Sequence, residues 1–348
     1  MIVARDDAAL EADRHTRALL PSVSRTFAVG VRLLPPRIEL PVRLGYLLCR
    51  IADTIEDDLV LGAPRKAELL DAFAACFDDA ERADTFGRIT LELTTSHDYR
   101  ALVAASDEVF ALYRLLDYST REILRRWILE MVDGMRTFIL LYPGGIRIAS
   151  MSEFHQYCYY VAGTVGHLLT DLWQEHSRSI NARVHARLLE DCESFGEALQ
   201  VVNILKDIAW DAEHENAVFI PSNVLQAMGS SHSHILDGAR RTANRRALEP
   251  LIGIAKNDIE RGLCYIENIP LHAVRVRLFC ALPILFAVAT TREIERSEEM
   301  LVPGGGVKIS RAEVRNIVIA ARTSALSNKS LRWLVDSIRW RPLGSRSG

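Results

Sequence analysis

Cysteine pairing is the first feature that the sequence lacks. Its six cysteines are scattered, mostly in apolar helical segments, and no CxxC pair occurs. This pattern argues against a zinc site and a disulfide framework, and it favours free thiols buried in a protein of the reducing cytoplasm. The six are Cys49, Cys76, Cys158, Cys192, Cys264 and Cys280.

An excess of one charge and the usual nucleotide-binding loops are also missing. The net charge is -3, and no basic run is interleaved with aromatic residues, which argues against a nucleic-acid-binding protein. There is no Walker A motif and no GxGxxG embedded in a strand, and the glycines at 304–306 are not followed by GK[ST].

Targeting and membrane-spanning segments are not evident. The N-terminus has no apolar run, so we expect no signal peptide. The most apolar segment, residues 278–290, is shorter than the ~20 residues that span a bilayer. We therefore interpret it as a buried core helix and expect a cytoplasmic protein, peripheral to the membrane at most. A surface anchor is the alternative.

Alternating apolar and polar residues, the pattern of strands, are nearly absent, and helical periodicity dominates. Hydrophobic residues at 49% and charged residues at 25% are typical of a globular protein. We predict an all-α fold with one main domain at 21–340, a lead-in at 1–20 and a polar tail at 341–348. Within it, 184–211 is expected to be one acidic helix and 311–338 a final amphipathic helix.

The chain is organised around residues 46–58, in which apolar residues recur at helical spacing. Asp53 and Asp57 are four residues apart, so both carboxylates lie on one side of the helix. Like charges at that spacing repel each other unless a cation offsets them. Mg²⁺ shared with a phosphate is the natural candidate.

Residues 200–211 repeat this arrangement with Asp207 and Asp211, and Asn203 lies four before Asp207. A cation precedes each acid pair: Arg50 in the first helix and Lys206 in the second. Two such helices facing each other would form a cleft for several Mg²⁺ ions and a diphosphate. Solvated helix faces with ordinary salt bridges are the alternative, and two pairs within apolar sequence disfavour it.

Two glycines, Gly163 and Gly166, interrupt a helical pattern over residues 157–169. Because glycine lowers helix propensity, their presence indicates either close packing or the close approach of a ligand.

Four segments resemble the squalene/phytoene synthase family, in the family's order. They are residues 24–27, 50–58, 157–166 and 203–211, within a match that covers about residues 20–310. Residues 279–290 and 307–309 look most like squalene synthases. The resemblance implies an isoprenoid-synthase fold around a central cavity. It also implies Mg²⁺-dependent condensation of two farnesyl diphosphates to presqualene diphosphate, followed by NADPH-dependent reduction to squalene.

The resemblance also implies roles for single residues. Metal binding falls to Asp53, Glu56, Asp57, Asp207 and Asp211. Diphosphate or cofactor binding falls to Arg25, Arg50, Asn203, Lys206 and Lys308, the last of these for NADPH. Tyr157 becomes the acid/base residue or cation stabiliser of cyclopropane formation. The isoprenoid pocket takes in Phe27, Tyr46, Val161, Val165, Gly166 and Gln200.

The chain departs from the family pattern in several places. Lys206 stands where Arg is usual, which replaces a bidentate fork with a point charge, and Trp210 stands where an acid is common. Residues 212–216 are acidic and lack glycine, where the family has a basic, glycine-containing loop. Near Lys308 the second basic position is Ser310, with Arg311 adjacent.

Several alternatives stay open from the sequence. The product could instead be presqualene diphosphate, dehydrosqualene or phytoene, made without NADPH. The chain length of the substrate is also left open. A non-catalytic assembly or binding homologue is disfavoured because the four aspartates, Arg50 and Tyr157 are all present. We expect a monomer with transient membrane contact for product release.

Overall fold

The computed structural model describes residues 2–344, with the side chains given from residue 7 except those of Arg25 and Thr26. Over this range the chain is helical and contains no strand; one isolated parallel bridge joins Arg147 and Val218. The predicted all-α class is confirmed. The chain divides into two compact units, and the boundaries predicted for a single main domain stay a prediction.

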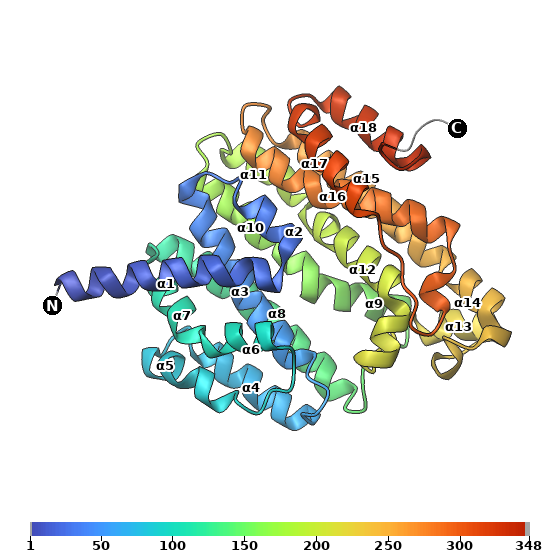
Figure 1. Cartoon of the computed structure of the whole chain (residues 1–348), viewed down its shortest axis with the longest axis horizontal. Helices are drawn as coiled ribbons and strands as arrows, with labels where there is room; N and C mark the ends of the chain where they lie inside the picture. The colour runs from blue at the N-terminus through green and yellow to red at the C-terminus, as the bar shows by residue number, and fades with distance from the viewer. Residues whose placement is uncertain (1, 345–348) are drawn as a thin grey trace. The chain divides into compact units, whose positions relative to one another are not determined.

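The first unit comprises Met1–Gly144 and Asp171–Ser177. Helix α3 packs against α1, α4, α6, α7 and α8 (Figure 1). The helices are α1 (Ile2–Val23), α2 (Arg25–Val31), α3 (Pro36–Glu56), α4 (Ala63–Ala75), α5 (Ala80–Ile89), α6 (His97–Ala104), α7 (Ser106–Leu115) and α8 (Tyr118–Leu141).

Helix α3 forms where the sequence predicts it. Pro36 occupies the first turn, where a missing N–H costs nothing, and Leu44, Leu47 and Ile51 are fully buried. The helix ends at Glu56, with Asp57 as its C-cap, several residues before the Gly62–Pro64 breaker. The acid motif therefore straddles the end of the helix.

The second unit comprises Gly145–Thr170 and Arg178–Gly348. Helix α12 packs against α9, α15, α16 and a π-helix, while α17 and α18 pack on α16. The helices are α9 (Met151–Cys158), the π-helix η1 (Tyr159–Gly163), α10 (Thr164–His176, shared with the first unit), α11 (Ala182–Leu189), α12 (Cys192–His214), α13 (Ser222–Ala227), α14 (Arg241–Ala247), α15 (Glu249–Asn268), α16 (Val274–Arg296), α17 (Arg311–Ser324) and α18 (Asn328–Trp340). Single 3₁₀ turns occur at η2 (His232–His234), η3 (Gly238–Arg240) and η4 (Glu299–Leu301).

Two predicted helices are divided in the structure. The span 184–211 contains the end of α11 and most of α12, which begins only at Cys192. The span 311–338 is two helices, because the chain leaves the helix after Ser324 and Ser327 caps α18 by accepting a bond from Ser330 N at 3.4 Å. Both predictions of a single helix were wrong at these breaks.

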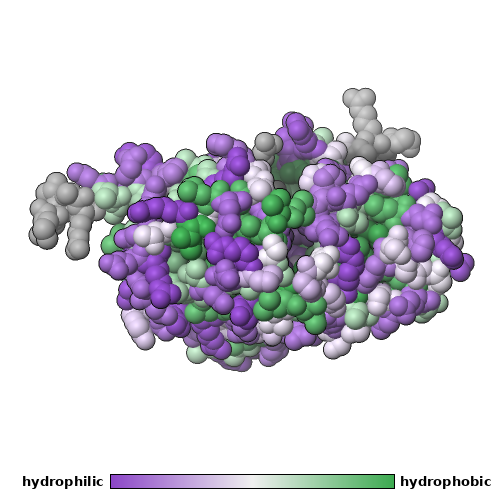
Figure 2. All heavy atoms as spheres, turned by 90° about the horizontal axis from the view of Figure 1, so that it is seen from below, coloured by the Kyte–Doolittle hydropathy of each residue, from purple (hydrophilic) through white to green (hydrophobic). Residues whose placement is uncertain are grey.

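Helix α16 (Val274–Arg296) contains the apolar segment 278–290 and has 23 residues. It is therefore long and apolar enough to cross a membrane, which corrects the estimate from segment length. Its most apolar window is 78% buried inside the protein, as in a core helix. On the face shown in Figure 2, hydrophilic side chains separate the apolar patches.

Candidate active site

The first carboxylate pair lies at the end of α3. Asp53 is half-buried and Asp57 is exposed at the C-cap, while Glu56 between them is only 8% exposed. Arg50, one turn before Asp53, pairs with it at 3.4 Å between Nη1 and Oδ2. The structure thus brings together four of the predicted residues.

Burial controls the electrostatics of this group. It raises the pKa of Asp53, and the opposing charge of Arg50 only partly offsets this. Burial would lower the pKa of Arg50, but Asp53 and two tyrosines keep the pKa above its ordinary value. A metal cation close to a carboxylate with a raised pKa, such as that of Asp53, would stabilise its charged form.

Two predicted pocket residues adjoin Arg50. Phe27 of α2 stacks on Tyr46 of α3 with ring centroids 4.1 Å apart. The Tyr46 hydroxyl accepts a bond from Arg50 Nη2 at 3.4 Å. The apolar stack and the phosphate-binding candidate are therefore contiguous. Arg25 begins α2, and its side chain lies outside the described residues.

Lys66 on α4 is a cation that sequence reasoning missed. Its ammonium group donates to the Glu56 carbonyl oxygen. Burial lowers the pKa of Lys66, whereas the charges of Glu56, Asp57 and Asp58 raise it in opposition. Helical spacing could not reveal this neighbour, because a turn separates α3 from α4.

The second carboxylate pair lies on α12. Asn203 is exposed, Asp207 is half-buried and Asp211 is 8% exposed. Gln200, half-buried, begins the same helical face. The Lys206 ammonium contacts the Asp207 carboxylate directly. Local helix geometry therefore places the amide, both acids and the cation together, as predicted.

The segment that carries Lys308 lies along this part of α12. Val307 N donates to the Lys206 carbonyl oxygen at 3.1 Å, and Gly304 N donates to Glu213 Oε2 at 2.8 Å. Lys308 itself is exposed. These two bonds place the segment that carries Lys308 beside the helix of the second acid motif, and contact between Lys308 and NADPH stays a prediction.

Tyr157 lies near the end of α9 and is 5% exposed. Its ring stacks on Phe219 with centroids 4.9 Å apart. The π-helix η1 follows directly, and Val161 lies within it, half-buried. Short π-helical insertions occur frequently at functional sites. Val165, on α10, is also half-buried.

Helix packing accounts for one of the two glycines in this segment. A Cβ on Gly166 would lie 1.9 Å from the Cys192 carbonyl oxygen. Gly196 on α12 makes the reciprocal approach, with an added Cβ 2.1 Å from the Ala162 oxygen. Of the two interpretations left open by the sequence, close packing explains Gly166 without a ligand.

Among the side chains that the structure describes, no group of three or more His, Cys, Asp or Glu is arranged to hold a metal. The paired carboxylates fit Mg²⁺ nonetheless, because this ion commonly takes one or two carboxylates and completes its shell with water and substrate phosphate. The two pairs belong to different units, so the cleft between them stays a prediction.

A comparison with known families shows which family the chain belongs to. The profile for squalene/phytoene synthases matches residues 20–313. The chain belongs to the squalene/phytoene synthase family. The resemblance seen in its four motifs is thereby confirmed.

Curated relatives of this family member are named as squalene synthases. The chain is 28% identical over 311 residues to the squalene synthase of Schizosaccharomyces pombe, covering 88% of this chain. It is 28% identical over 305 residues to a probable squalene synthase of Neurospora crassa, covering 86% of this chain. The matches span 64% and 60% of the two relatives' own lengths.

Solved structures of the family share the fold. A complex of TcSQS with the ligand BPH1237 superposes with a TM-score of 0.83 at 22% identity, covering 97% of this chain and 94% of that one. A dehydrosqualene synthase in complex with a ligand gives 0.60 at 16% identity, covering 97% and 98%. At these identities the likeness shows the fold alone.

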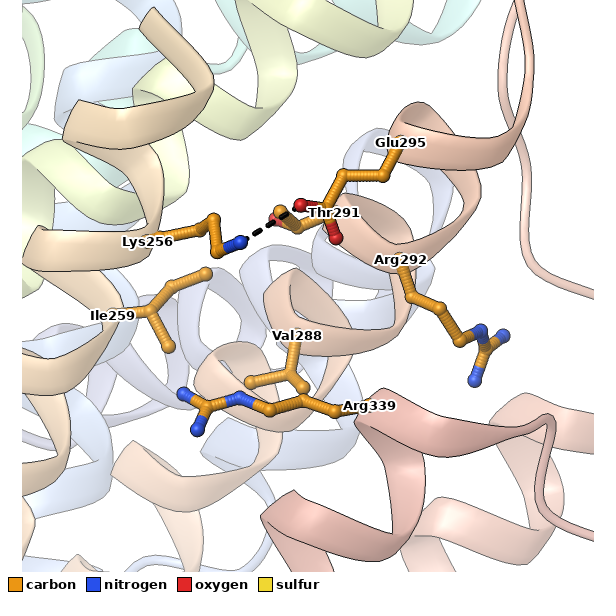
Figure 3. A pocket seen from close by; sticks show the side chains of 7 residues that line it. All are labelled: Lys256, Ile259, Val288, Thr291, Arg292, Glu295 and Arg339. Carbon is orange, nitrogen blue, oxygen red and sulfur yellow. Dashed lines mark hydrogen bonds and ion pairs between the residues drawn. The ribbon is translucent and has the colours of Figure 1, made fainter. Parts of the chain in front are cut away.

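A cavity of about 160 Å³ lies elsewhere in the second unit of this family member, and none of the predicted site residues lines it (Figure 3). Its charged groups already have partners: Lys256 pairs with Glu295 at 2.8 Å, Arg292 with Glu313 at 2.8 Å, and Arg339 with Glu260. The charged side chains that line the cavity are therefore already paired with other residues.

Proposed function

We propose that this chain is a squalene synthase. It condenses two farnesyl diphosphates head to head, with Mg²⁺, to presqualene diphosphate, and then reduces and rearranges that intermediate to squalene with NADPH. The observation that carries the proposal is the repeated carboxylate pair, on α3 and on α12, each with a cation beside it. The names of the curated relatives support the same activity.

Ionisation of an allylic diphosphate needs positive charge on the leaving group, which Mg²⁺ supplies when it is bound. The metal-binding role belongs to Asp53, Glu56, Asp57, Asp207 and Asp211. Arg50 and Lys206 bind phosphate oxygens, with Asn203 and Arg25 as further donors. In this scheme Lys206 contributes a point charge rather than the bidentate fork of an arginine.

The carbocation needs a site that excludes water. Tyr157 suits this role because it is buried against Phe219 beside the π-helix. In the proposal it holds or moves the proton lost during cyclopropane formation, while its ring face stabilises positive charge. The proposal assigns isoprenoid contacts to Phe27 and Tyr46 of the first unit, and to Val161 and Val165 of the second.

NADPH binding is assigned in this proposal to the segment that carries Lys308. Lys308 and Arg311 are both exposed cations that could contact its phosphates. Their segment is attached to α12 through Val307 and Lys206. The acidic stretch at 212–216 gives no further cation.

The test is a product assay. Purified protein is incubated with farnesyl diphosphate and Mg²⁺, with and without NADPH, and the lipids are identified by mass spectrometry. We expect squalene only with NADPH. Presqualene diphosphate or dehydrosqualene in both reactions would overturn the reductive half alone.

Matched variants make this assay specific. Asp53→Asn and Asp207→Asn should each lower turnover at least a hundredfold while leaving the thermal midpoint nearly unchanged, because they remove metal ligands rather than core contacts. Asp336→Asn, at an exposed acid on α18, is the control and should keep full activity. A folded wild-type protein that makes no product from farnesyl or geranylgeranyl diphosphate would favour the non-catalytic alternative.

A further inference from the structure

The surroundings of Arg50 include a residue that the acid motif does not contain. Its guanidinium carbon lies 5.8 Å from the centroid of the Tyr46 ring and 5.7 Å from that of Tyr99. Both distances are within the range of a cation–π contact. Tyr46 is on the same helix, whereas Tyr99 comes from α6 (His97–Ala104).

The polar contacts of Arg50 are long by comparison. Nη2 lies 3.4 Å from the Tyr46 hydroxyl, and Nη1 lies 3.4 Å from Asp53; both exceed the usual N–H···O distances. Its Nε is buried and has no hydrogen-bond partner among the described residues. A buried N–H without an acceptor is uncommon in folded proteins. An anion arriving at the site would supply the missing acceptor.

Tyr99 is held in place by an anchor at the end of the acid motif. Asp58 is 2% exposed, and its Oδ2 accepts bonds from Thr94 N at 2.6 Å and Thr94 Oγ1 at 3.0 Å. Its Oδ1 accepts from Val60 N and Leu61 N at 2.9 Å each. The last acid of the motif is thus occupied in fixing the segment that leads into α6.

Helix α6 is also fixed through its own residues. Ser96 caps it by accepting a bond from Tyr99 N at 3.5 Å, and Leu102 and Val103 are 0% and 1% exposed. Helices α3 and α6 pack against each other in the first unit. The Tyr99 ring therefore sits on a rigid support, half-buried at its own position.

We infer that Tyr99 is a positioning residue whose ring holds the Arg50 guanidinium, so that its uncommitted N–H groups face an incoming diphosphate. The inference rests on the proposed function, because the diphosphate is that of the proposed substrate. An aromatic face suits the task, since it attracts the cation without occupying any of its five donors. The donors stay available for phosphate oxygens.

Binding of inorganic diphosphate with Mg²⁺, measured by calorimetry, tests this directly. Tyr99→Leu should weaken binding about three- to thirtyfold and raise KM for farnesyl diphosphate more than it lowers kcat. Tyr99→Phe keeps the ring face and should stay within about twofold of wild type. Tyr118→Leu, at a 70% exposed tyrosine of the same unit, is the control for a surface change.

A double-mutant cycle separates positioning from a general loss of packing. In an Arg50→Gln background, Tyr99→Leu should change binding by less than about twofold, because the cation that it positions is gone. Equal losses with and without Arg50 would mean that Tyr99 acts through packing, and would overturn the inference. So would a Tyr99→Phe variant as weak as Tyr99→Leu, which would assign the effect to the hydroxyl.

Failure of the inference and failure of the proposed function give different results. If wild type forms product and Tyr99→Leu binds diphosphate as tightly as wild type, the inference is wrong and the function stands. If folded wild-type protein neither binds diphosphate nor forms product, the proposed function is wrong, and the inference about Tyr99 falls with it. Thermal unfolding of every variant establishes that a lost signal comes from the site.

Discussion

Among single residues, Glu197 on α12 is a largely buried acid outside the candidate site. Its side chain is 14% exposed and lies 3.9 Å from His155. Burial raises the pKa of Glu197 to about 7, and the charges of Asp258 and Glu193 raise it further. Asp258, only 5% exposed, also has a raised pKa because of burial. Burial therefore favours the protonated, uncharged form of both acids.

This pKa makes a prediction about stability against pH. The folded protein keeps a proton on Glu197 that the unfolded chain releases near pH 4.3, so the contribution of this group to stability falls as pH rises from about 4.5 to 7. Glu197→Gln should remove this fall and be more stable than wild type by about 1–3 kcal/mol at pH 8. At pH 4 the two should be equal.

Urea unfolding at pH 4, 6 and 8 measures the effect. Glu190→Gln, at an exposed acid just before α12, is the control and should change stability by less than about 0.5 kcal/mol at every pH. A Glu197→Gln protein with the same pH dependence as wild type would show that another group carries it.

The run Glu56, Asp57 and Asp58 shows how far a sequence can resolve single residues. Spacing predicts that Asp57 shares a face with Asp53, and the Asp57 N–H donates to the Asp53 carbonyl oxygen at 2.9 Å. Spacing does not separate Asp57, exposed at a helix cap, from Asp58, whose oxygens are taken up by backbone and Thr94 donors. Periodicity describes one helix, whereas these donors come from the following turn and from a segment before α6.

At the scale of elements, the contact between α12 and the π-helix depends on a glycine. A Cβ on Gly196 would lie 2.1 Å from the Ala162 carbonyl oxygen, so α12 and the π-helix approach through this position. Gly196→Ala should destabilise the protein by about 1–3 kcal/mol or more, because the neighbouring atom is backbone and cannot move aside.

Gly253 offers the matched comparison. It lies in the interior of α15, is exposed, and has nothing within 4 Å of an added Cβ. Gly253→Ala should therefore stabilise the protein by about 0.5–1 kcal/mol through helix propensity. Thermal or urea unfolding of both variants checks the pair, and opposite signs are expected. A Gly196→Ala variant as stable as wild type would mean that the approach of α12 is looser than described.

Element boundaries were the part of the fold that the sequence predicted least well. The breaks before Cys192 and after Ser324 fall within helical patterns, so apolar periodicity does not reveal them. Only Ser327, which caps α18, is a sequence signal for one of the two breaks. The centres of α3, α12 and α16 were predicted because their apolar spacing is long and regular. Lys66 and Tyr99 were missed because their neighbours come from other helices.

At the scale of the whole molecule, packing decides how the most apolar helix is used. Helix α16 could span a bilayer by length and composition, yet its apolar window is 78% buried. Its N-terminal Arg277 is fully buried and donates to the carbonyl oxygens of Ala325 and Ile266 at 2.8 and 2.6 Å. These bonds attach α16 to the end of α15 and to the turn before α18. If α16 left this packing, the Arg277 charge and the carbonyl groups bonded to it would lose their partners.

A liposome flotation assay tests that role. The 348-residue chain, without substrate, should stay in the bottom fraction with phosphatidylcholine vesicles, because α16 has no free apolar face to insert. A synthetic peptide of residues 274–296 should float with the same vesicles, since nothing then covers its side chains and its mean hydropathy is 1.7 over the apolar window. Flotation of the folded chain would require α16, or another surface of the protein, to reach lipid. Hydrogen exchange on vesicles would then identify which, because an inserted α16 must first lose the bonds made by Arg277.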